Sequence, residues 1–226
     1  MPNIYLSNDD SSTCEGQLSI NECFRALECM PNNKTPGSDG LPAEFYKTFW
    51  QDIGILVTNS FNHVFINKHL ASELGRAVIN LILKLDKDTT RLKNWRPISL
   101  LNSDYKIAAK SIASRLKSVL NILINDNQTG FMKGSYIGEN IRLVLDLIQY
   151  TTDNDLPGFL FLLDSEKAFD TISWNFINRS LSFFNFGCDF KRWINTFYSN
   201  VSACVMNNGH SSVFLVYLAG SVKDAH

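Results

Sequence analysis

The stretch Phe159-Leu160-Phe161-Leu162-Leu163-Asp164-Ser165-Glu166-Lys167-Ala168-Phe169-Asp170 decides the fold class that we expect for this chain. Five apolar residues run into Asp164 after a Pro157-Gly158 turn, which is typical of a buried strand. A carboxylate at the end of such a strand is costly unless it is paired or binds a cation. A helical pattern follows over residues 174–184. The pattern leaves two interpretations open: a catalytic carboxylate held on a rigid element, or an ion-paired Asp164 beside a helix cap at Asp170.

Composition sets broad limits on the class of protein. The chain has 226 residues, 45% of them hydrophobic, with 21 basic and 22 acidic side chains, which is enough for one large domain. No apolar run approaches the ~18 residues that a membrane span needs, and we expect no signal peptide. The five cysteines show no C-x-x-C spacing. We therefore expect free thiols without disulfides, no membrane partner, and an intracellular location in the nucleus or cytoplasm.

The basic residues are concentrated in one segment although the whole chain is nearly neutral. Nine basic and three acidic residues lie between Lys84 and Lys117, which leaves a formal charge of +6 there. Such an asymmetry creates a local positive field and indicates a nucleic-acid contact. A solvated helix face is the alternative interpretation.

Local patterns predict most of the elements. A capping box at Ser19-Ile20-Asn21-Glu22 starts a helix, while residues 1–18 are polar, lack periodicity and are expected to form a loose tail or linker. Apolar runs at 77–84 and 96–100 predict two strands joined by a basic loop that could fold over a triphosphate. Residues 201–217 predict a hairpin about the turn Asn207-Asn208-Gly209-His210.

Five blocks of the sequence together resemble the reverse transcriptases of non-LTR (LINE-type) retrotransposons. These blocks occur in the family's order over roughly residues 19–217: Pro36-Gly37-Ser38-Asp39-Gly40-Leu41-Pro42-Ala43-Glu44-Phe45-Tyr46, Asn94-Trp95-Arg96-Pro97-Ile98-Ser99-Leu100-Leu101-Asn102, Asp104-Tyr105-Lys106, Gln128-Thr129-Gly130-Phe131 and Leu163 to Asp170. The resemblance implies an α+β fold, a partial right-hand polymerase. Its parts would be an N-terminal helical extension (19–76), a fingers-like region (77–157) and an incomplete palm (158–226).

The resemblance also implies a catalytic site. Asp164 matches the metal-binding aspartate of the family's first catalytic motif, and Mg²⁺ is the expected ion in its two-metal nucleotidyl transfer. Phe169 matches the bulky side chain under the sugar that excludes a 2′-hydroxyl; an ordinary core aromatic is the alternative. Arg96 matches a basic residue that contacts the triphosphate of the incoming nucleotide, and Lys84 lies near the position of a second one. Deoxynucleotides, an RNA template and a DNA primer would be the partners.

Four further residues are expected to lie along nucleic acid. Lys106 and Lys110 belong to an amphipathic helix whose first role is to build the core and whose basic face could track a phosphate backbone. Gln128 and Lys133 fall in a glycine-bearing loop that lies along the template strand in the resembling family. A plain turn at Gly134 is the alternative for that loop.

The sequence departs from the family after Asp170. Residues 220–224 are at most a degraded start of the family's Gln-bearing block, and no adjacent pair of aspartates follows. We therefore expect a fragment of an RNA-directed DNA polymerase that is inactive alone. The alternative is a non-catalytic nucleic-acid-binding module derived from a retrotransposon. A phosphatase with an aspartyl nucleophile is a third class, but Ser165-Glu166 breaks its pattern.

Overall fold

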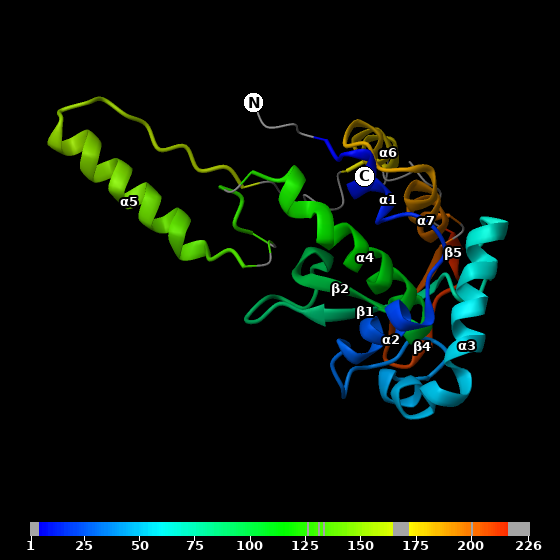
Figure 1. The fold of residues 1–226 in the computed structure, drawn as a ribbon. Helices are drawn as coiled ribbons and strands as arrows, with labels where there is room; N and C mark the ends of the chain where they lie inside the picture. The colour runs from blue at the N-terminus through cyan, green and yellow to red at the C-terminus, as the bar shows by residue number, and fades with distance from the viewer. Residues whose placement is uncertain are drawn as a thin grey trace.

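The computed structural model describes residues 5–125, 127–130, 132, 134–164, 172–199 and 201–216. Within these ranges the chain is a mixed α+β structure, as the sequence predicted (Figure 1). The helices are α1 (Asn8–Ser12), α2 (Ile20–Glu28), α3 (Ala43–Asn67), α4 (Ser103–Leu123), α5 (Ile137–Asp153), α6 (Trp174–Phe183) and α7 (Cys188–Tyr198). The strands are β1 (Arg76–Leu83), β2 (Trp95–Leu101), β3 (Ser202–Asn207), β4 (His210–Ser211) and β5 (Leu215–Val216).

The sheet has the order β2-β1-β3-β4, with β5 also paired to β3. β1 and β2 are antiparallel, with Ile82 opposite Arg96, which confirms the predicted hairpin. β3 lies parallel to β1 on its other side, although more than a hundred residues separate the two strands. Asn208 and Gly209 both have positive φ in the turn between β3 and β4, as a type I′ hairpin turn requires. The predicted C-terminal hairpin is therefore confirmed through β5.

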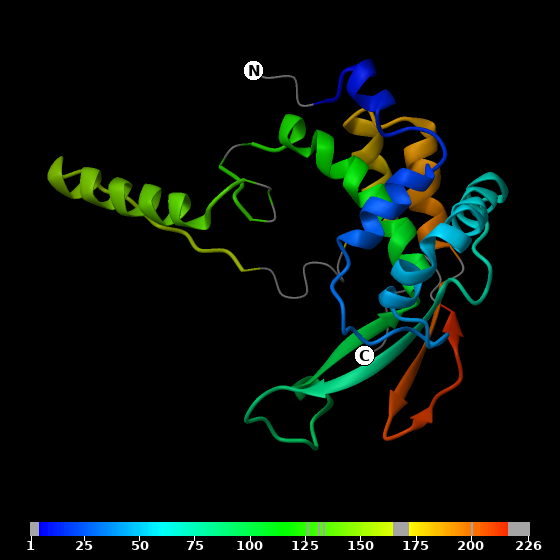
Figure 2. The ribbon, with the colours of Figure 1, turned by 60° about the horizontal axis from the view of Figure 1, so that its bottom comes forward.

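The helices pack on one another beside the sheet, and the main core lies among the helices. Figure 2 shows α2, α3, α4 and α7 gathered above the sheet. Trp193 and Phe190 of α7 are fully buried, and the Trp193 ring stacks on Phe65 of α3 with centroids 4.8 Å apart. Ile107 and Ile112 of α4 belong to the same buried cluster. The apolar periodicity of α4 and α7 therefore predicted their buried faces correctly, whereas no residue of α5 or α6 is buried although both helices carry a predicted apolar face.

The expectation of a loose N-terminal tail is wrong for residues 5–18. Leu6, Cys14 and Leu18 are buried in the main core. The carboxylate of Glu15 accepts hydrogen bonds of 2.9 Å from the backbone N–H groups of Asp189 and Phe190 in the first turn of α7. Isolated apolar side chains and single hydrogen bonds hold this segment against the core. Such contacts leave no periodic pattern in the sequence, so periodicity could not predict that the segment is ordered.

Candidate functional site

The apolar run that decided the predicted fold does not form a strand. Residues 159–163 have no sheet pairing, and their side chains are 59% to 102% exposed. The prediction of a buried strand is therefore wrong, because a strand needs a hydrogen-bonded partner and the sheet in the described part of the chain is built on β1 and β3 instead. α5 and this run extend away from the body of the molecule (Figure 1).

The exposed run predicts poor solubility that one lysine should relieve. Five consecutive apolar residues without charge or proline form a segment that is prone to β-aggregation. Phe161→Lys should therefore raise the protein concentration at which light scattering begins to increase. Leu92→Lys is the matched control, because Leu92 is similarly exposed (81% against 79% for Phe161) but stands alone in another loop. Equal gains from both variants would show that added charge, rather than interruption of the run, is responsible.

The described residues do not assemble a two-metal site around Asp164. Asp164 is exposed at the end of the unpaired run. No group of three His, Cys, Asp or Glu side chains that could hold a metal ion occurs within the ranges given above. Phe169 and Asp170 lie outside the described residues. The donor set that is described therefore does not fit the metal pair that the resemblance implied, and Asp164 and Phe169 stay predictions.

The β1–β2 hairpin brings Lys84 and Arg96 to one face. Directly opposite residues of an antiparallel pair point to the same side, and Ile82 lies opposite Arg96. Lys84 follows Ile82 by two residues and therefore shares this face. Arg96 is exposed, and within the described part of the chain no acidic side chain forms an ion pair with it. The two residues that the resemblance assigned to a triphosphate are therefore neighbours.

The loop between β1 and β2 is held by its own hydrogen bonds. The Lys84 ammonium donates to the Lys93 carbonyl at 2.9 Å and closes the base of the loop. The Trp95 indole N–H donates to the Thr89 carbonyl at 3.0 Å, and Asn94 Nδ2 donates to the Asp88 carbonyl at 2.8 Å. Lys84 is therefore partly used in shaping the loop, while Lys87, Arg91 and Lys93 are exposed on it.

Both candidate lysines of α4 lie against the protein itself. Lys110 donates to the carbonyl of Cys29 at 2.8 Å, where α2 ends. A cation at the C-terminus of a helix interacts favourably with the helix dipole, so Lys110 has a structural role. Lys106 is half-buried, and burial lowers the pKa of its ammonium. Gln128 is exposed in the loop before α5, and Lys133 lies outside the described residues.

Sequence reasoning missed a buried contact between two of the motif blocks. Asn102 is buried just before α4, and its amide oxygen accepts from the Ser38 hydroxyl at 3.3 Å. Its amide nitrogen donates to the Glu73 carbonyl at 3.1 Å. A Cβ on Gly37 would collide with Asn102, so the loop needs glycine there. Gly37 and Asn102 belong to two of the motif blocks, but no spacing rule pairs residues that lie so far apart in the sequence.

The contact of Asn102 with Gly37 and Ser38 places the loop at residues 36–40 beside the start of α4. Burial, with the nearby charge of Asp39, raises the pKa of the Asp104 carboxyl. Asp39 also acts electrostatically on Lys106. The loop at 36–40, the end of β2 and the start of α4 therefore form one continuous unit next to the hairpin.

The chain is similar to proteins of known family. The profile of the family "Reverse transcriptase (RNA-dependent DNA polymerase)" matches residues 82–221, more than half of the chain. "Transposon TX1 uncharacterized 149 kDa protein" from Xenopus laevis is 37% identical over 194 residues, which cover 86% of this chain and 15% of that protein. No helix in the described part of the chain has the length and apolar character for a membrane span.

Two proteins of Drosophila melanogaster are more distant relatives. "Probable RNA-directed DNA polymerase from transposon BS" is 26% identical over 158 residues, covering 69% of this chain and 17% of its own length. "Probable RNA-directed DNA polymerase from transposon X-element" is 27% identical over 153 residues, covering 67% and 17%. The matches with the three relatives thus span 15% to 17% of the relatives' lengths.

Proposed function

The chain belongs to the reverse transcriptase family, as a domain of the LINE type, and on this premise we propose that it forms the fingers and the first part of the palm of an RNA-directed DNA polymerase. Its proposed task is to hold the triphosphate of a nucleotide and the backbone of a template strand. The face of the β1–β2 hairpin that carries Lys84 and Arg96 is the observation on which this proposal rests.

The hairpin has the charge that this task requires. Five basic residues and two acidic residues lie between Lys84 and Arg96, which leaves a formal charge of +3. Asp88 is partly neutralised by Arg91 at 3.5 Å. An arginine guanidinium presents planar paired donors to phosphate oxygens, and lysines add mobile positive charge. The hairpin therefore supports binding to phosphate groups more strongly than α4 does, because Lys110 is already engaged with α2.

The proposal predicts a salt-dependent loss of affinity when the hairpin is neutralised. Lys93→Gln/Arg96→Gln should weaken binding to an RNA–DNA primer–template, measured by fluorescence anisotropy at several salt concentrations. Each lost phosphate contact should flatten the slope of log affinity against log salt by about 0.9. Because both side chains are exposed, the thermal unfolding midpoint should stay unchanged.

Arg25→Gln/Arg142→Gln is the matched control for this experiment. It removes the same charge from exposed arginines on α2 and α5, away from the hairpin. Equal affinity and equal salt slopes for the two double variants would contradict the proposal, because net charge alone would then explain the binding.

A non-catalytic nucleic-acid-binding module is the second candidate function. The exposed Lys93 and Arg96 of the hairpin would serve this function without a metal ion. Both functions predict binding by the hairpin, so binding data do not separate them. Primer extension by a completed domain separates them, and its expected result is given in the Discussion.

A further inference from the structure

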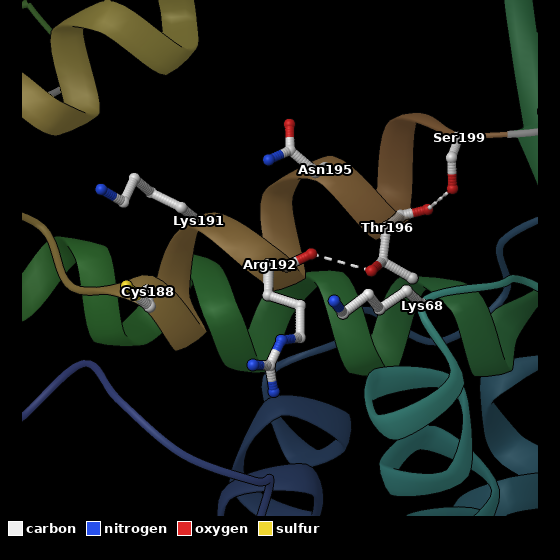
Figure 3. Close-up of a pocket in the computed structure, with 7 residues that line it drawn as sticks. All are labelled: Lys68, Cys188, Lys191, Arg192, Asn195, Thr196 and Ser199. Carbon is white, nitrogen blue, oxygen red and sulfur yellow. Dashed lines mark hydrogen bonds between the residues drawn. The ribbon is translucent and has the colours of Figure 1, made fainter.

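A second basic surface lies between α7 and the end of α3, outside the hairpin. It is a solvent-open cavity of about 430 Å³, and Figure 3 shows the side chains that line it. Lys68 comes from the C-cap of α3, and Lys191 and Arg192 come from α7. Cys188 lies at the start of α7, at one end of the cavity. In Figures 1 and 2 the β1–β2 loop extends away from α7.

The cavity has an unbalanced positive charge. Among the described residues, three basic and no acidic side chains line it. Arg192 is fixed by two contacts: its guanidinium lies 4.7 Å from the centre of the Phe65 ring, and it pairs with Asp189 at 3.3 Å. Asp189 offsets one of the three charges, so the positive charge of Lys68 and Lys191 remains. Lys191 has a weak contact of 3.4 Å with the Ser182 hydroxyl.

Polar donors accompany the charges. Asn195 lies on the same side of α7, and its amide oxygen accepts a hydrogen bond from the Asn178 amide nitrogen at 2.9 Å. The amide nitrogen of Asn195 is therefore the group that can donate to a ligand. The hydroxyls of Thr196 and Ser199 donate to backbone carbonyls of α7, so their protons are not available to a ligand. The cavity thus offers two lysines, a fixed guanidinium and one amide donor.

We propose that this cavity binds the phosphodiester backbone of a nucleic-acid strand, as a contact separate from the hairpin. An open cavity of this size has room for a passing strand, and lysines with an arginine are the residues that contact phosphate groups. A nucleic acid is the fitting polyanion because the chain is a reverse transcriptase domain. The contact goes beyond the proposed function of the hairpin and would extend the path of the strand across α7.

Cys188 provides a local reporter for this contact. Cys14, Cys23 and Cys204 are buried, whereas Cys29 and Cys188 are exposed. In Cys29→Ser protein, an uncharged maleimide should therefore label Cys188 first. A short single-stranded RNA should slow this labelling several-fold, and Lys68→Gln/Lys191→Gln should abolish most of the protection. Added salt should also abolish it in the protein with both lysines, which keeps the test valid if the double variant misfolds.

Matched controls decide between the possible outcomes. Arg25→Gln/Arg142→Gln should retain full protection, because it removes equal charge elsewhere. Inorganic phosphate and polyglutamate, each at the same concentration of negative groups, should protect much less than RNA. Protection by either probe that equals that of RNA would overturn the assignment to a nucleic-acid strand. Absence of protection by RNA at low salt would overturn it as well.

The test is independent of the hairpin proposal. Lys93→Gln/Arg96→Gln in the Cys29→Ser background should lower overall affinity while saturating RNA still protects Cys188. Loss of Cys188 protection at saturation in this hairpin variant would show that the two surfaces are not separate contacts, and would contradict the inference. A hairpin variant with unchanged affinity would contradict the proposed function alone.

Discussion

Arg115→Ala is expected to lower the free energy of unfolding by about 3–5 kcal/mol, the usual cost of removing one partner of a buried ion pair. The Arg115 side chain is 8% exposed, and its Nε donates to Glu22 at 2.7 Å. The guanidinium also donates to four consecutive backbone carbonyls, those of Cys14, Glu15, Gly16 and Gln17, at 2.7 to 3.2 Å. Without it, a partly buried carboxylate and these carbonyls lose their donors.

Chemical denaturation of two further variants tests this explanation. Arg115→Lys keeps the charge but not the planar set of five donors, so it should still lose most of the stability. Lys117→Ala, two residues along the same helix and exposed, should change stability little. If Arg115→Ala costs no more than Lys117→Ala, the guanidinium is not what holds residues 14–17 against α4.

The same ion pair should make stability depend on pH. Burial by itself raises the pKa of Glu22, but the hydrogen bonds from Arg115 and Ser19 outweigh it and hold that pKa below the ordinary value. A depressed folded-state pKa contributes stability above the unfolded-state value, and this stability is lost as the pH falls through the folded-state pKa. Stability should therefore decline below about pH 4.5, and Glu22→Gln should flatten this part of the curve.

Residues 1–226 by themselves are expected to show no primer extension with Mg²⁺ or Mn²⁺ and all four deoxynucleotides. Asp164 is exposed on an unpaired run, no three-donor cluster occurs among the described residues, and no adjacent aspartate pair follows Asp170 in the sequence. An incomplete set of metal-binding carboxylates costs several kcal/mol of transition-state stabilisation, or a factor of roughly a thousand or more in rate.

A chimera that adds the palm and thumb of a related reverse transcriptase should extend the primer. Asp164→Asn in that chimera should abolish extension while leaving primer–template affinity unchanged. Extension by the 226-residue chain alone, if Asp164→Asn abolished it, would show that the carboxylate set is complete after all. Extension by the chimera that survives Asp164→Asn would refute Asp164 as a metal ligand and favour the non-catalytic module.

The sequence by itself determined the elements whose rules are local. The capping box of Ser19 and Glu22 forms as predicted, because its two hydrogen bonds join residues only three apart. The turn at Asn208-Gly209 needs positive φ at both positions, which these residue types permit. Helical periodicity likewise found the buried faces of α4 and α7. Each of these features depends on neighbours along the chain, so a single sequence contains enough information.

Only the tertiary structure decided how distant segments meet. Arg115 donates hydrogen bonds to the carbonyls of residues 14–17, and β3 pairs with β1. The local sequence of these segments does not indicate their partners. The apolar run at 159–163 has strand composition yet stays exposed, since a strand forms only where another strand accepts its backbone hydrogen bonds. The cations of the α3–α7 cavity come from segments more than a hundred residues apart, so their shared charge arises from packing alone.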